Sequence, residues 1–148
     1  MLETLKDADV SIGSRYVDGG GTVNWGVGRK IISRGGSLYA RTILGIPLRD
    51  CTGGFNGWKR NVLETLGLDT METTGYSFHI ELKHRALVSG FRVKEFPIIF
   101  EDRQVGQSKM SSQIFVEAMK QVWKFRFKYG TLAAAKRRQA RLSSTSTS

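Results

Sequence analysis

Short strand-like segments alternate with longer helix-like segments along this chain of 148 residues, and this alternation restricts its fold more than any other feature. Strand patterns cover residues 9–13, 55–59 and 91–100. The alternation predicts an α/β protein in which helices flank a small mixed sheet. Three strands are fewer than the roughly five or six of an average sheet. We therefore expect part of a larger sheet rather than a complete one.

Four segments between and after these strands have helix patterns. They cover residues 29–44, 61–66, 76–89 and 111–129. Segment 29–44 ends at Gly45 and Pro47, as a helix should. Segment 76–89 mixes apolar residues with the polar residues Glu81, Lys83, His84 and Arg85. The strand pattern 91–100 contains Pro97, which favours an edge or bulge position because proline donates no ladder hydrogen bond.

The chain has 17 glycines but only 2 prolines. Clustered glycines in the first half predict loops where the backbone approaches another group closely. These clusters are Gly19–Gly21, Gly35–Gly36 and Gly53–Gly54. We expect residues 14–28 to form a glycine-rich loop.

The charge balance points to an anionic partner. Lysine and arginine number 23 against 13 acidic residues, which gives a net charge of +10. Nucleic acid, an anionic membrane surface and phosphorylated substrates all fit this excess. The single cysteine, Cys51, excludes an internal disulfide and favours a reducing compartment. The sequence contains no apolar run long enough for a simple transmembrane helix, and residues 1–10 do not resemble a signal peptide.

Three patterns suggest metal or thiol chemistry, but each has a simpler interpretation. Asp7 and Asp9 have the spacing of a cation-binding D-x-D motif, yet they precede a strand, so we interpret them as its charged lead-in. His79 and His84 are five residues apart and have no cysteine cluster nearby, which argues against a zinc site. We expect Cys51 to be buried rather than nucleophilic.

Four residues at the ends of predicted elements are candidates for one anion site. Arg15 follows a strand, and Arg29 and Ser33 share one face at the start of a helix. Arginine forks and a serine hydroxyl suit phosphate oxygens. Arg103 lies in the loop 101–109, which is either a solvated ion-pair cluster or a flap over an active site. We predict that these four residues converge.

Several motifs, in order, resemble the polyprenol-phosphate (dolichol-phosphate) mannosyltransferases of glycosyltransferase family 2. The matching segments cover residues 12–16, 24–25, 29–35, 50–55, 75–82, 96–98, 100–103 and 106–110. The resemblance implies a GT-A-type fold, of which this chain would be a part. It also implies transfer of mannose from GDP-mannose to a membrane polyprenyl phosphate, with inversion at the anomeric carbon.

The resemblance covers only the C-terminal half of that family. We accordingly expect residues 1–130 to be the acceptor-side half of the domain and 131–148 to be a basic, Ser/Thr-rich disordered tail. The family's divalent cation, Mg²⁺ or Mn²⁺, would have its ligands in the missing half, so we expect no metal site here. Another polypeptide would then supply that half, and we expect the chain alone to be inactive or nearly so.

By resemblance, individual residues take roles in the acceptor site. Arg15, Arg29 and Ser33 would hold the lipid phosphate, and Arg103 and Asp50 would be catalytic. The acceptor loop would include Glu101, Asp102 and Lys109. The implied location is peripheral, at the cytoplasmic face of the membrane.

Two other functions remain open. A half-enzyme would be a non-catalytic membrane module, and the basic, aromatic segment 123–129 would also permit nucleic-acid binding, although no nucleic-acid motif is present. In the helix 111–129, Met119, Val122 and Trp123 fit core contacts, whereas Phe125 and Phe127 fall outside that stripe. The second pair, flanked by lysines, predicts contact with lipid headgroups.

Overall fold

The computed structural model describes residues 1–71, 73, 75–101, 112–131 and 133–137, and only the backbone of 112–115. Its elements are, in order, α1 Leu2–Asp7, β1 Val10–Ser14, β2 Gly21–Val23, α2 Val27–Leu44, β3 Asn56–Trp58, α3 Arg60–Leu66, a 3₁₀ turn at Leu68–Thr70, α4 Gly75–Val88, β4 Val93–Pro97, β5 Ile99–Glu101 and α5 Ser112–Tyr129. The predicted α/β class is confirmed.

The strands form two small sheets. Strand β1 is central in the larger one, antiparallel to β3 and parallel to β4, with Val10 opposite both Trp58 and Val93. Strands β2 and β5 pair in parallel, with Thr22 opposite Phe100. The small mixed sheet is therefore as predicted, whereas the GT-A-type arrangement remains a prediction.

The segment predicted as one strand, 91–100, is divided between the two sheets. Strand β4 ends at Pro97 on an edge of its sheet, where the missing N–H leaves no gap in a ladder. Next, Ile98 donates its N–H to Ser14 O at 3.0 Å and accepts from Gly21 N at 3.0 Å, which links the sheets. The partner strand β2 lies inside the segment that we predicted to be entirely loop.

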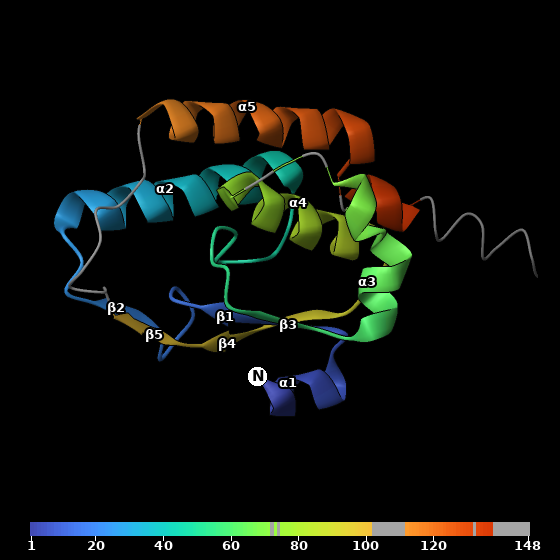
Figure 1. Ribbon diagram of the computed structural model, residues 1–148, viewed down its shortest axis with the longest axis horizontal. Coiled ribbons are helices and arrows are strands. Elements are labelled where there is room, and N and C mark those ends of the chain that lie inside the picture. Colours follow the sequence, from blue (N-terminus) through green and yellow to red (C-terminus); the bar gives the residue numbers. More distant parts are fainter. Residues whose placement is uncertain (72, 74, 102–111, 132, 138–148) are drawn as a thin grey trace, which may run out of the picture.

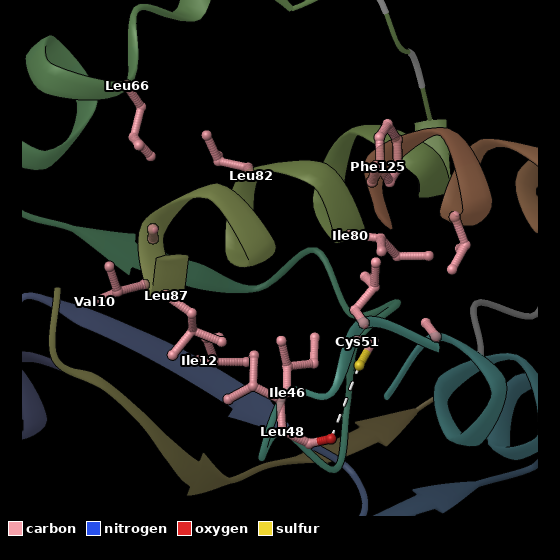
Figure 2. Packing of buried hydrophobic residues seen from close by; sticks show 14 of the residues in the cluster. Val10, Ile12, Ile46, Leu48, Cys51, Leu66, Ile80, Leu82, Leu87 and Phe125 are labelled. Atoms are coloured by element: carbon pink, nitrogen blue, oxygen red, sulfur yellow. Dashed lines mark hydrogen bonds between the residues drawn. The ribbon is translucent and has the colours of Figure 1, made fainter. Parts of the chain in front are cut away.

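Helices cover both faces of the larger sheet (Figure 1). Helices α2, α4 and α5 lie on one side, and α1 lies on the other, against β1, β3 and β4. Because both faces are covered, every residue of β1 is buried. Figure 2 shows the apolar core between β1 and the helices, which includes Val10, Ile12, Cys51, Ile80 and Phe125.

Helix α2 brings small side chains to the core. It confirms the predicted helix at 29–44 with two residues added at its start, and it ends at Gly45, which adopts φ +65° and donates to Arg41 O. Its inward positions are Ser33, Ser37, Ala40 and Leu44. These short side chains let the helix lie close to the turn at residues 50–53, where Cys51 N donates to Ser37 Oγ at 3.3 Å.

The aromatic residues that helix α5 buries and exposes differ from those that we predicted. Val122 and Phe125 are buried in the core, three residues apart on one face, so Phe125 does not lie outside the stripe. Trp123, which fitted a core contact, is 44% exposed and stacks on Phe127, which is 81% exposed. Within the described ranges, no helix is long and apolar enough to cross a membrane.

Beyond α5, residues 133–137 form a further helical turn. Ala135 N donates to Thr131 O at 2.9 Å there. This turn lies within the segment that we predicted to be a disordered tail. Residues 138–148 lie outside the described part of the chain.

Candidate anion-binding site

A pocket opens between α2, α4 and α5 beside the end of β1. Its polar lining consists of Arg15, Arg29, Ser33 and Thr52, from three separate parts of the sequence. The rest of the lining is apolar or aromatic and includes Trp25, Ile32, Tyr39, Tyr76, Ile80, Met119 and Val122. The pocket therefore combines two guanidinium groups and two hydroxyl groups with an apolar wall.

Arg15 is held in the pocket wall by Asp50. Its Nε and Nη2 donate to the two carboxylate oxygens at 2.7 Å each, and its backbone N donates to Oδ2 at 3.1 Å. Gly53 N donates to Oδ1 at 2.9 Å, so the carboxylate accepts from four N–H groups. Arg15 Nη2 also donates to Thr52 Oγ1 at 3.0 Å. Asp50 is fully buried, and Arg15 is only 8% exposed.

This buried pair stays ionised. Burial raises the pKa of Asp50, but the hydrogen bonds and charge of Arg15 outweigh it and hold that pKa below its ordinary value. Burial lowers the pKa of Arg15, but the Asp50 carboxylate outweighs it and raises that pKa. Arg15 Nη1 forms no hydrogen bond to any described residue. Arg15 is therefore oriented by Asp50 and still has N–H groups for another acceptor.

Trp25 lies between two arginines. The Arg29 guanidinium is 4.1 Å from the centroid of the indole ring and that of Arg15 is 5.2 Å from it. Phe100 of β5 meets the same ring edge-on at 5.6 Å. The indole N–H is buried and has no acceptor among the described residues.

Ser33 is oriented by a tyrosine. Tyr16 OH donates to Ser33 Oγ at 2.6 Å, which leaves the proton of the serine hydroxyl for a different acceptor. The ring of Tyr16 is in turn faced by Arg15 and Arg34, at 5.2 and 5.4 Å from its centroid. Sequence reasoning included Tyr16 only in a motif and did not give it this role.

The pocket thus brings together three of the predicted site residues, Arg15, Arg29 and Ser33. Asp50 lies behind Arg15 rather than in the open pocket, and its predicted catalytic role remains a prediction. Glu101 is exposed at the end of β5. Asp102, Arg103 and Lys109 lie outside the described residues, so their roles and the convergence of Arg103 stay predictions.

The structure also shows the surroundings of the D-x-D pattern and of Cys51. Asp9 forms ion pairs with Lys59 at 3.3 Å and Arg92 at 3.5 Å, while Asp7 lies 3.9 Å from Lys94. The charged lead-in interpretation is therefore confirmed. Cys51 is buried, as predicted, and its burial raises the pKa of the thiol to about 12.

The described part of the chain contains no group of three His, Cys, Asp or Glu side chains that could hold a metal ion. These residues do not offer the donor set of a divalent cation. A cation in the complete enzyme remains a prediction from the resemblance.

One buried group near the site was missed altogether. Lys83 of α4 is fully buried and donates to the backbone oxygens of Asp50, Cys51 and Gly53 at 3.0, 3.2 and 2.8 Å. Its partners are about thirty residues earlier in the chain, so no local pattern could have found them.

A mixed α/β fold therefore surrounds a pocket with two arginines, the hydroxyl groups of Ser33 and Thr52, and a wall of apolar and aromatic side chains. The chain is 44% identical over 119 residues, 80% of its length, to an undecaprenyl-phosphate mannosyltransferase of Micrococcus luteus. It is 44% identical over 112 residues, 76% of its length, to a polyprenol monophosphomannose synthase of Mycolicibacterium smegmatis. The resemblance to polyprenol-phosphate mannosyltransferases that the motifs predict is therefore confirmed.

The similarity covers only part of those proteins. The chain spans about half the length of the curated relatives it matches, with 49% of the first and 42% of the second covered. No family model matches the chain.

Proposed function

We propose that this chain is the acceptor-side part of a glycosyltransferase that moves mannose onto a polyprenyl phosphate. The observation that carries the proposal is the convergence of Arg15, Arg29 and Ser33 on one pocket with an apolar wall. The three polar groups match the oxygens of a phosphate monoester, and the apolar wall matches the first part of its lipid chain. The names of both relatives supply the sugar and the class of lipid.

The reaction needs little proton chemistry. A phosphate oxygen of the lipid attacks the anomeric carbon of mannose, the bond from that carbon to the donor diphosphate breaks, and the electron pair leaves with the diphosphate. The attacking oxygen is already anionic, so no strong base is required. The protein must instead hold two anions close together, and Arg15 and Arg29 reduce the repulsion between them.

The donor and the metal belong to the proposal by resemblance alone. We propose GDP-mannose as the donor and Mg²⁺ or Mn²⁺ as the cation that would neutralise the leaving diphosphate. Because the described residues include no donor set for such an ion, no step is assigned to it here. We further propose that a separate polypeptide or a further segment supplies the donor side.

A peripheral position at the cytoplasmic face of the membrane completes the proposal. Trp123 and Phe127 form an exposed aromatic pair on α5, and Lys120, Lys124 and Lys128 are exposed on the same helix. Aromatic rings flanked by lysines favour the headgroup zone of an anionic membrane. The lipid substrate would be presented there.

Binding of a short acceptor tests the site without the missing half. We expect the chain to bind farnesyl phosphate, followed by calorimetry at pH 7, and to bind farnesol or inorganic phosphate much more weakly. Arg29→Ala should lower the affinity at least tenfold, since it removes a charged phosphate contact. Arg60→Ala is the matched control, because that side chain is 91% exposed on α3 and does not line the pocket. Equal binding of farnesyl phosphate and farnesol would contradict the proposal.

The second candidate is a non-catalytic, membrane-associated module, favoured by the partial coverage of the relatives. We expect no transfer of mannose by the chain alone and measurable transfer once the donor side is supplied. Binding of farnesyl phosphate without transfer in either mixture would favour the module. A nucleic-acid partner is not proposed, and binding to a generic oligonucleotide that is stronger than binding to the lipid phosphate would overturn that choice.

A further inference from the structure

We infer that Lys83 is a positioning residue for the acceptor site, acting through the turn at residues 50–53. The inference rests on the proposed function of the pocket. It concerns a residue that neither the sequence patterns nor the known resemblance assigned to the site. The Lys83 ammonium group is fully buried among backbone carbonyl groups.

The ammonium group is completely satisfied by one turn of the backbone. Its three protons match three carbonyl oxygens, of Asp50, Cys51 and Gly53, at 3.0, 3.2 and 2.8 Å. The side chain is 0% exposed, so water cannot substitute for any of these acceptors. A buried lysine arranged in this way imposes one conformation on the turn, since moving any carbonyl leaves a charged donor unsatisfied.

The opposite edge of the turn is held by a carboxylate. Glu95 on β4 accepts from the backbone N–H groups of Arg49 and Asp50 at 2.8 Å each. The main chain is therefore fixed by an ammonium on its carbonyl side and by a carboxylate on its N–H side. Between these contacts the turn presents the Asp50 side chain to Arg15 and the Thr52 hydroxyl to the pocket. Lys83 therefore contacts the turn, and the turn contacts Arg15, which we predict to bind the phosphate.

Lys83 also adds charge behind the pocket. Together with Arg15, Asp50 and Glu95 it forms a group of two cations and two anions, whose charges balance only while Lys83 is charged. Without the charge of Lys83 the group would be net negative and would disfavour an anion in front of it. The same lysine therefore acts by geometry and by its field.

The charge of Lys83 is open to titration. Burial lowers the pKa of Lys83 to about 8, partly offset by Asp50. The groups that face it are Asp50 and Cys51 in the turn, Arg15 at the end of β1, Glu95 on β4 and His79 on its own helix. The pKa values of Asp50 and His79 are lowered and that of Arg15 is raised, while that of Cys51 is about 12.

Two measurements test the inference. The first needs no variant: affinity of the chain for farnesyl phosphate is measured by calorimetry between pH 7 and pH 9. The ligand is a dianion over this range, because the second pKa of a phosphate monoester is about 6. We expect the affinity to fall about tenfold, because the charged form of Lys83 favours the dianion and, with a pKa of about 8, the charged fraction falls about tenfold from pH 7 to pH 9. A constant affinity from pH 7 to pH 9 would overturn the field effect.

The second measurement separates positioning from a general loss of stability. Lys83→Met removes charge and donors, and Lys83→Gln keeps an N–H donor without the charge. Val62→Ala opens a cavity in the apolar core where α3 packs. Val62 is 0% exposed and does not line the pocket. We expect both Lys83 variants to bind at least tenfold more weakly at pH 7 without further loss at pH 9, and Val62→Ala to bind like the wild type. Amide exchange at Gly53, bonded to Asp50 at 2.9 Å, should accelerate in Lys83→Met relative to Val62→Ala.

The outcomes distinguish this inference from the proposed function. If the wild-type chain does not bind farnesyl phosphate at pH 7, the function proposed for the pocket fails and this inference fails with it. If the wild type binds and Lys83→Gln or Lys83→Met binds equally well, only the role of Lys83 is refuted. If Val62→Ala loses as much affinity as the Lys83 variants, Lys83 is merely structural.

Discussion

Replacing Asp50 by asparagine should expose how much the fold depends on the buried ion pair. The carboxylate accepts from Arg15 Nε and Nη2 at 2.7 Å, from Arg15 N at 3.1 Å and from Gly53 N at 2.9 Å. Asparagine replaces one of the two acceptor oxygens by an NH₂ group, which must face a donor. It also leaves the Arg15 guanidinium, only 8% exposed, without its counter-charge.

The cost of removing one partner of a buried ion pair is about 3–5 kcal/mol. That is a large share of the roughly 5–15 kcal/mol by which a domain is usually stable. Equilibrium unfolding in urea at pH 7, followed by circular dichroism, should therefore show a strongly lowered midpoint for Asp50→Asn. Asp18→Asn makes the same chemical change on an exposed carboxylate paired with Arg49 at 3.4 Å, and it should leave the midpoint unchanged.

The stability that this ion pair provides also depends on pH. Because the pKa of Asp50 is lowered in the fold, its contribution is present above the pKa of the unfolded chain and is lost as the pH falls through the folded pKa. The stability difference between the wild type and Asp50→Asn should therefore shrink in acid. A loss below about 1 kcal/mol at pH 7, or a difference that grows in acid, would refute this account of the pair.

Three further predictions test other parts of the structure. Burial lowers the pKa of His84 to about 4, so the unfolded chain binds a proton at a higher pH than the folded chain does. The free energy of unfolding, measured in urea, should therefore fall by about 3 kcal/mol as the pH drops from 6.5 to 4. His84→Leu should not show this pH dependence of the free energy of unfolding. Gly13→Ala should lower the melting temperature, because the new Cβ would lie 2.9 Å from Phe55 O. Gly35→Ala, in helix α2 with nothing within 4 Å of the new Cβ, should instead raise stability by about 0.5–1 kcal/mol, and equal shifts for the two glycines would contradict the packing. Phe127→Ser should reduce sedimentation with anionic vesicles roughly tenfold, because it removes an 81% exposed aromatic ring from the proposed membrane contact; unchanged sedimentation would exclude this ring from that contact.

The sequence was most informative about the bounds of the long helices. Helices α2, α4 and α5 begin and end within two residues of their predicted bounds, and each is followed within two residues by a glycine with a positive φ, namely Gly45, Gly90 or Gly130. Strands β2 and β5 were not separated from their surroundings because each has three residues, too few for a period of two to be read. The change of sheet at Ile98 depends on hydrogen bonds to Ser14 and Gly21, which no local pattern reports.

The candidate site shows the same division. Arg15, Arg29 and Ser33 could be nominated from their chemistry and from their positions at the ends of elements. Lys83 could not, because a lysine followed by His84 and Arg85 on a helix is expected to face solvent. Helix α4 instead buries Ser77, Glu81, Lys83 and His84, and the partners of Lys83 are carbonyl groups whose positions follow only from the tertiary fold.

The central position of β1 also sets the order in which the chain can fold during synthesis. Val10 pairs with Trp58 on one side and with Val93 on the other, so β1 is made before both of its partners and must wait for β4. Until β4 has left the ribosome, β1 has one edge unpaired and its apolar residues Val10 and Ile12 incompletely covered. Pairings so distant in sequence make folding slow and leave the nascent chain open to association with other chains. A polypeptide that ends before Val93 would keep the loop, the helix α2 and most of the pocket residues, yet it would lack the strand that closes the sheet beneath them.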